Sequence, residues 1–261
     1  MDENGLRLQY QKEGYLVLKG ILRQVDLARL SALVEPIYQA WFKDNEALIF
    51  EHKMLNMHSL TRPEYFFDEV QNRARLFDAI AHPKLIEVAD KVFGEGLYFH
   101  NTQLFFNPTN SARRPYWHRD MQYSPFSESD LMAELGNMLN LHFRIPFIKE
   151  TGIELVPGTH QRWDNSEERK VRLELDGHLN SDKLSGSKLI TLDVGDVLIF
   201  NAQMLHRGNY ALNSERKALD LCIGKYHKFT APSLDKNCLP STIEMKNIKH
   251  KKWYRSAYEV M

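Results

Sequence analysis

Cysteine is scarce in this chain. Only two of its 261 residues are cysteines, Cys222 and Cys238. Two are too few for a disulfide framework or a zinc knuckle, and their scarcity is typical of a reducing compartment. We therefore expect a packed apolar core to stabilise the fold, and hydrophobic residues make up 43% of the chain. The chain is long enough to form one large domain around such a core.

The chain also lacks a net charge and long apolar runs. Lys+Arg and Asp+Glu number 34 each, so no overall field attracts nucleic acid or an anionic membrane. No apolar run is long enough to span a bilayer, and the first residues do not resemble a signal peptide. We predict a soluble, cytoplasmic protein with no membrane span and no nucleic-acid partner.

Helical patterns dominate the first third of the sequence. A short strand is expected over residues 14–18. It is followed by an amphipathic helix over 27–41 with Asp26 as its N-cap. A second helix is expected to begin with the proline of His82-Pro83 and to end at Gly94. Residues 43–75 show no clear periodicity.

Short strands dominate from residue 97 onward. Helices followed by many short strands indicate an antiparallel β-sandwich or barrel with helices on one face. We divide the single expected domain, residues 1–261, into a helical part (about 1–95), a β core (about 96–228) and a C-terminal extension (229–261). The strands are expected at 97–107, around His118, and at 137–148, 152–156, 189–192, 197–200 and 218–226.

The stretch Tyr116-Trp117-His118-Arg119-Asp120 carries a candidate metal site. Side chains two residues apart on an extended strand share a face, so His118 and Asp120 can bind one ion. A distant histidine would complete the 2-His-1-carboxylate set, which leaves open positions on Fe(II). His206 follows a strand and is the candidate. Arg216 begins the next strand, where its forked donors could hold a carboxylate beside the metal.

Three stretches carry this combination: WHRDMQYSPF (117–126), TGIELVPGTH (151–160) and residues 195–216 from Gly-Asp to the arginine. They resemble the phytanoyl-CoA dioxygenase family of Fe(II)/2-oxoglutarate oxygenases. The resemblance covers residues 97–226 well and the N-terminal helical part more loosely. It implies a mainly β fold with α: a double-stranded β-helix (jelly roll, cupin-like) core flanked by N-terminal helices.

The resemblance also implies roles for individual residues. His118, Asp120 and His206 would hold Fe(II), Arg216 would hold the distal carboxylate of the cosubstrate 2-oxoglutarate, and Gln103 would lie near the cosubstrate. The implied reaction uses O2 to hydroxylate a C–H bond of a small-molecule substrate and converts 2-oxoglutarate to succinate and CO2. Related halogenases have a small residue at the carboxylate position, where chloride binds, so Asp120 favours hydroxylation.

The sequence departs from the family pattern near the candidate site. Gly208 stands where the family often has a hydroxyl-bearing residue, two positions after the distal histidine. Trp117 and segment 128–137 also differ from the lipid-acting members, so phytanoyl-CoA itself is not assumed as the substrate. Arg119 or Arg144 is expected to hold an acidic substrate, and His142 to touch the pocket. Aromatic residues expected to form an apolar wall are Phe105, Tyr116, Trp117, Tyr123 and Phe126.

Other interpretations remain open on the sequence. A non-catalytic metal or small-molecule binding module is possible on the same scaffold, because fold does not dictate function. A zinc hydrolase using the same ligands is a weaker alternative, since no glutamate base lies near the motif. Segment 164–188 is expected to be a long loop that serves as a lid or is disordered. The basic cluster within 246–255 is expected to be a solvated helix face, with phosphate binding as the alternative.

Overall fold

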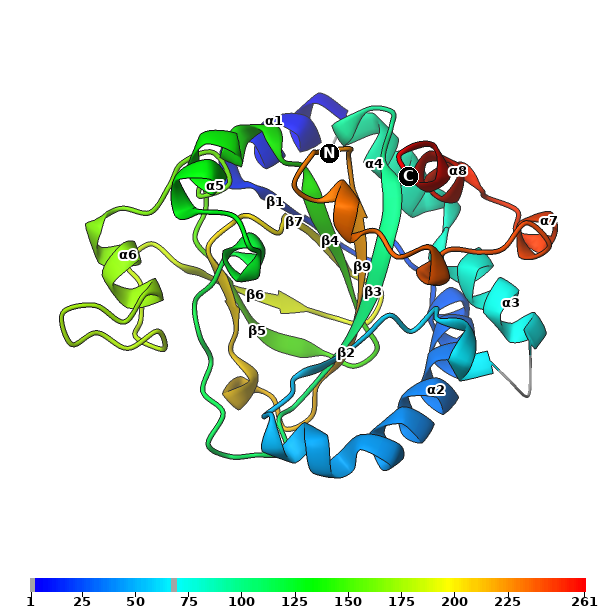
Figure 1. Cartoon of the computed structure of the whole chain (residues 1–261), viewed down its shortest axis with the longest axis horizontal. Coiled ribbons are helices and arrows are strands. Elements are labelled where there is room, and N and C mark those ends of the chain that lie inside the picture. The colour runs from blue at the N-terminus through cyan, green and yellow to red at the C-terminus, as the bar shows by residue number, and fades with distance from the viewer. Residues whose placement is uncertain (1–2, 67–69) are drawn as a thin grey trace.

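The computed structural model describes residues 3–66 and 70–261 and places helices around two β-sheets (Figure 1). Among the described residues, no helix combines the length and apolar character needed to cross a bilayer. The α-helices are α1 (Glu3–Glu13), α2 (Gln24–Glu51), α3 (Val70–Ile80), α4 (Pro83–Phe93), α5 (Glu128–Glu134), α6 (Ser166–Arg172), α7 (Glu244–Asn247) and α8 (Lys252–Glu259). The strands are β1 (Tyr15–Leu18), β2 (Asn56–His58), β3 (Tyr98–Phe106), β4 (Asn140–Pro146), β5 (Glu150–Leu155), β6 (Lys188–Leu192), β7 (Val197–Asn201), β8 (His206–Gly208) and β9 (Lys217–Gly224).

The strands form two antiparallel sheets. The larger sheet has the order β1-β7-β4-β9-β3-β2, and the smaller one has the order β6-β5-β8. Apolar side chains of both sheets meet between them, for example Leu155 of β5, Leu192 of β6 and Phe200 of β7. This arrangement is the sandwich of antiparallel sheets that the strand pattern predicts.

The two faces of the larger sheet differ in chemistry because successive side chains of a strand alternate between faces. On β4, Leu141, Phe143 and Ile145 belong to the main apolar core, which helices share. His142 and Arg144 lie between them in sequence and point to the opposite face. That face is turned toward the smaller sheet, so buried polar groups lie inside the sandwich.

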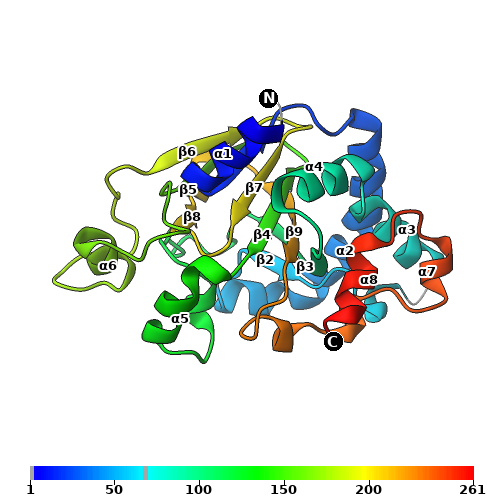
Figure 2. The same ribbon diagram turned by 90° about the horizontal axis from the view of Figure 1, so that it is seen from above.

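The C-terminal helix α8 packs against β3 and α3 (Figure 2). The ring of Tyr254 lies 5.2 Å from that of Phe77 and 5.4 Å from that of Phe99. Trp253 is fully buried as well, whereas Arg255 is exposed. The aromatic residues of the C-terminal basic cluster therefore belong to the core.

Of the two long helices predicted in the first third of the chain, the first is corrected and the second is confirmed. Helix α2 begins at Gln24, so Asp26 lies within its first turn and is not the N-cap. The Asp26 carboxylate instead accepts hydrogen bonds from Arg23 at 2.8 and 3.0 Å. The helix after His82 begins at Pro83, and its C-cap is Gly94, as predicted.

Three segments differ from the sequence interpretation. His118 makes an isolated bridge to His206, and Asp120 begins a 3₁₀ helix, η2 (Asp120–Tyr123), so no regular strand carries the motif. Segment 164–188 is not a plain loop, because α6 forms within it. The side chain of Asn165 caps this helix, and an N-cap of this kind is not visible in the periodicity of apolar residues. Residues 43–75 contain the end of α2, then β2 and the start of α3, with 67–69 outside the described residues.

Candidate active site

Backbone pairing brings the three candidate ligands together. His118 and His206 exchange two backbone hydrogen bonds of 3.0 Å, and the amide of Asp120 donates to the carbonyl of Ala202 at 3.1 Å. Arg119 has extended dihedral angles, so the side chains before and after it share a face although no strand is present. The same-face prediction therefore holds locally.

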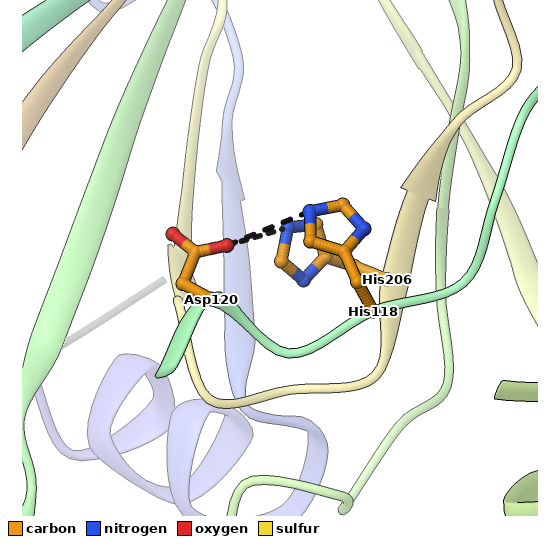
Figure 3. A group of neighbouring side chains, drawn as sticks. All are labelled: His118, Asp120 and His206. Atoms are coloured by element: carbon orange, nitrogen blue, oxygen red, sulfur yellow. Dashed lines mark ion pairs between the residues drawn. The ribbon is translucent and has the colours of Figure 1, made fainter. Parts of the chain in front are cut away.

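The ligand atoms converge on one point (Figure 3). The Nε2 atoms of His118 and His206 lie 3.6 and 3.4 Å from Oδ1 of Asp120. One donor atom from each residue lies within 4.8 Å of the others. Two imidazole nitrogens and a carboxylate oxygen at this spacing can bind a single divalent metal ion on one face.

Hydrogen bonds fix the orientation of both imidazoles. Nδ1 of His118 lies 3.2 Å from the carbonyl of Tyr116, and Nδ1 of His206 lies 2.9 Å from the carbonyl of Met204. A carbonyl only accepts, so each Nδ1 carries the proton and each Nε2 keeps its lone pair. Both lone pairs are therefore available to a metal.

The electrostatics of the three side chains also suit a cation. Burial lowers the pKa of His118, and burial together with the charge of His118 lowers the pKa of His206 to about 3. Burial alone would raise the pKa of Asp120, but His142 and the two other imidazoles hold it well below its usual range. Neutral imidazoles and an ionised carboxylate are the forms that bind metal.

His142 holds the second oxygen of Asp120. Its Nε2 lies 2.8 Å from Oδ2 of Asp120, and its Nδ1 lies 3.0 Å from Oδ2 of Asp220. The expectation that His142 touches the pocket is thus met, and its partner Asp220 has no place in the sequence motif. The one available signal is a charged residue within the apolar run Ala-Leu-Asp-Leu of β9.

Arg216 belongs to a buried ion cluster on the inner face of the larger sheet. It is 4% exposed, and its Nε donates to Oε1 of Glu150 at 2.5 Å. Arg144 donates to both oxygens of Glu150 at 2.7 Å and to Asp220 at 3.0 Å. A continuous series of charged hydrogen bonds therefore runs from Asp120 to Arg216. Sequence analysis missed Glu150, which lies outside the family-like stretches.

Gly208 makes room for this arginine. A Cβ atom at Gly208 would lie 2.9 Å from Nη2 and 3.1 Å from Nη1 of Arg216. The glycine, which departs from the family pattern at this position, therefore avoids a steric clash with Arg216. The absent side chain leaves the space that the guanidinium group occupies.

A cavity of about 410 Å³ adjoins the triad and reaches Arg216. Gln103 lines it and also a smaller cavity of about 160 Å³ behind Asp120. The amide oxygen of Gln103 accepts a hydrogen bond of 2.8 Å from Asn56. Phe105, Tyr116 and Tyr123 line the larger cavity as expected.

Three other expected pocket residues lie elsewhere. Trp117 is fully buried, and its indole donates to the carbonyl of Asp182 at 2.8 Å. The ring of Phe126 stacks on that of Phe229 at 4.0 Å. Arg119 is 1% exposed and donates to Asp164 at 2.8 and 3.0 Å, away from the cavity. The expectation that Arg119 holds an acidic substrate is therefore wrong, because a protein carboxylate already occupies its donors.

Comparisons with known proteins point to the family that the sequence resembles. The chain matches the family model Phytanoyl-CoA dioxygenase (PhyH) over residues 10–218. It is 21% identical over 239 residues to the Homo sapiens protein "Phytanoyl-CoA dioxygenase, peroxisomal", with 84% of this chain and 68% of that protein covered.

Two solved structures share the fold. AviO1 from Streptomyces viridochromogenes Tue57 has a TM-score of 0.57 at 16% identity, covering 86% of this chain and 95% of that one. EctD from S. alaskensis, crystallised with 2-oxoglutarate and 5-hydroxyectoine, has a TM-score of 0.54 at 15% identity, covering 98% of this chain and 84% of that one. At such identities the likeness concerns the fold, and it confirms the predicted jelly roll.

Proposed function

Because the chain belongs to the Phytanoyl-CoA dioxygenase (PhyH) family, we propose that it hydroxylates a C–H bond of a small-molecule substrate. Family membership confirms the resemblance seen in the sequence, and the chain is a non-haem Fe(II)- and 2-oxoglutarate-dependent oxygenase. The proposal extends this class to a reaction: O2 and 2-oxoglutarate are consumed, and succinate, CO2 and a hydroxylated product are formed.

The observation that carries the proposal is the convergence of three ligand atoms whose lone pairs face one point. His118, Asp120 and His206 would hold the iron through Nε2, Oδ1 and Nε2. When bound, iron with 2-oxoglutarate and O2 supplies the oxidising power that attacks the C–H bond. The protein's own contribution is to orient these groups and to exclude water.

Arg216 is proposed to hold the distal carboxylate of 2-oxoglutarate. Its Nε is engaged by Glu150, which fixes the plane of the guanidinium group. Its Nη atoms make no hydrogen bond to a described residue, and the side chain lines the cavity. Two parallel donors match a carboxylate. Gln103 is proposed to border the cosubstrate from β3.

Anaerobic titration tests the proposal directly. Fe(II) is added to the protein under nitrogen, 2-oxoglutarate follows, and the visible metal-to-ligand charge-transfer band is recorded. Succinate release in air is measured next, including slow turnover without substrate. We expect the band and succinate formation in the wild type and no succinate formation in Asp120→Ala, because this substitution removes one of the three ligands.

Asp44→Ala is the matched control, because Asp44 is an exposed residue of α2 far from the triad in sequence. It should retain both signals. Asp120→Ala turning over at the wild-type rate would refute the ligand assignment. Tight metal binding by the wild type without O2 consumption would instead identify a non-catalytic binding module.

A further inference from the structure

Arg113 differs from the other arginines that line the larger cavity. Arg144 and Arg216 are paired with Glu150 at 2.7 and 2.5 Å, and Arg207 is paired with a glutamate at 3.0 Å. Arg113 has no carboxylate partner among the described residues, and its Nε is buried without a hydrogen-bond partner; the Nε of Arg207 is also unpartnered, but its Nη2 is held by a glutamate. Buried donors in native proteins are normally satisfied, so the Arg113 donor points to a ligand.

A second unsatisfied polar group lies beside it. Tyr210 is 5% exposed and lines the same cavity, and its buried hydroxyl has only a loose contact with the Arg113 side chain and no hydrogen bond of normal geometry to a described residue. Burial raises the pKa of Tyr210 to about 12, while the nearby charge of Arg113 lowers it. The phenol therefore stays protonated and can donate a hydrogen bond next to the guanidinium group.

The position of this pair relative to the metal ligands is fixed by Tyr116. The guanidinium carbon of Arg113 lies 4.4 Å from the centroid of the Tyr116 ring. The same ring lies 4.8 Å from the ring of His118. A ligand held by Arg113 would thus pass along Tyr116 and reach the metal ligands within a single cavity.

We infer that Arg113 and Tyr210 bind an oxyanion group of the substrate, which is therefore a small molecule carrying a carboxylate or phosphoryl group. The inference rests on the proposed function and names the substrate class of that site. A guanidinium group presents parallel donors that match such an oxyanion, and the Tyr210 hydroxyl adds another donor. Arg216, held by Glu150, remains the separate partner of the cosubstrate.

Matched acids and amides test the inference on the protein loaded with Fe(II) and 2-oxoglutarate under nitrogen. The probes are acetate and acetamide, benzoate and benzamide, 3-phenylpropanoate and 3-phenylpropanamide, and inorganic phosphate for the phosphoryl case. Binding is measured by calorimetry and by the change in the charge-transfer band. We expect at least one acid, or phosphate, to bind roughly tenfold more tightly than the neutral amides.

Four variants test which side chains produce the preference for the anion. Arg113→Gln should abolish the preference for the anion and leave 2-oxoglutarate affinity within about twofold of wild type, and Tyr210→Phe should reduce the preference. Arg114→Gln is the control, because Arg114 is the exposed neighbour in sequence. Thermal unfolding of each variant checks that it is folded, and Arg113→Lys should restore part of the preference.

The results that would contradict the inference differ from the result that would contradict the proposed function. Equal binding of acids, phosphate and amides, including no binding by any of them, overturns the inference. It is also overturned if the preference survives Arg113→Gln or if that variant loses 2-oxoglutarate binding, which would assign Arg113 to the cosubstrate. A wild type that gives no charge-transfer band with 2-oxoglutarate would instead contradict the proposed function itself.

Discussion

The Nε2 atom of His142 lies 2.8 Å from Oδ2 of Asp120, the carboxylate oxygen that faces away from the other two ligands. Because Nδ1 of the same ring lies 3.0 Å from a second carboxylate, Asp220, both ring nitrogens act as donors. Burial lowers the pKa of His142, but Cys222, Asp120 and Asp220 more than offset this effect and raise it well above its ordinary value. The hydrogen bond leaves Oδ1 of Asp120 free as a single-oxygen ligand.

Replacing His142 should weaken metal binding. In His142→Leu the Oδ2 atom of Asp120 loses its donor, and Fe(II) affinity should fall by about 10- to 100-fold. His142→Gln keeps one amide donor and should lose less. Anaerobic calorimetric titration measures both affinities, with the exposed His250→Gln as control. Equal affinities in all four proteins would show that the hydrogen bond does not orient Asp120.

Adding a methyl group at position 208 should weaken the binding of the cosubstrate and leave the binding of the metal unchanged. The new Cβ in Gly208→Ala would meet Nη2 of Arg216 at 2.9 Å, so the guanidinium group must shift. We expect KM for 2-oxoglutarate to rise roughly tenfold, equivalent to about 1.4 kcal/mol, with Fe(II) affinity unchanged.

Gly136→Ala provides the control for that variant. A Cβ at Gly136 meets no described atom within 4 Å, and the backbone there does not have a positive φ. Succinate release as a function of 2-oxoglutarate concentration gives KM for both variants. An unchanged KM in Gly208→Ala would mean that Arg216 does not contact the cosubstrate.

The positions of most strands and the candidate ligand set were predictable because they depend on local patterns. Alternation of apolar and polar residues identified β4, and His118-x-Asp120 required only an extended residue between the ligands. The partners of these residues were not predictable. Glu150 meets Arg216 only because a distant strand pair brings them together, and no spacing in the sequence encodes that contact.

The polarity of individual side chains did not reveal which way they point. Arg113 and Arg119 lie close together in the sequence and have the same side chain, but their surroundings differ. Arg119 is taken up by Asp164 and by the carbonyls of Thr159 and Gln203, whereas Arg113 faces the cavity. Only the surrounding contacts distinguish a scaffold arginine from one that is available to a ligand.

Removing the charge of Arg119 should destabilise the whole protein. Arg119→Met leaves buried carbonyls and the Asp164 carboxylate without this donor, and we expect a loss of about 3–5 kcal/mol in unfolding free energy. Arg7→Met is the control, because the Arg7 side chain is 46% exposed in its pair with Glu3, whose side chain is 49% exposed, and should contribute below about 1 kcal/mol. Urea unfolding followed by circular dichroism measures both. Similar losses in the two variants would contradict the scaffold role.

Glu150 should make stability depend on pH. Burial alone would raise its pKa, but the charges of Arg144 and Arg216 lower it from 4.5 to about 2. Because the folded-state pKa lies below the unfolded one, the stabilisation is complete above about pH 4.5 and is lost as the pH falls toward 2. Between about pH 6 and about pH 3.5, this carboxyl group alone should lose about 1.4 kcal/mol.

The variant Glu150→Gln isolates this contribution, since an amide of the same shape does not titrate. The difference in unfolding free energy between wild type and Glu150→Gln should be largest near about pH 6 and should shrink by about 1.4 kcal/mol on acidification to about pH 3.5. The exposed Glu87→Gln should show no comparable narrowing of the difference, because both side chains of the Glu87–Lys91 pair are exposed on the surface of α4. A constant difference across this range would mean that Glu150 is not held ionised by the two arginines, and the proposed support of Arg216 would fail with it.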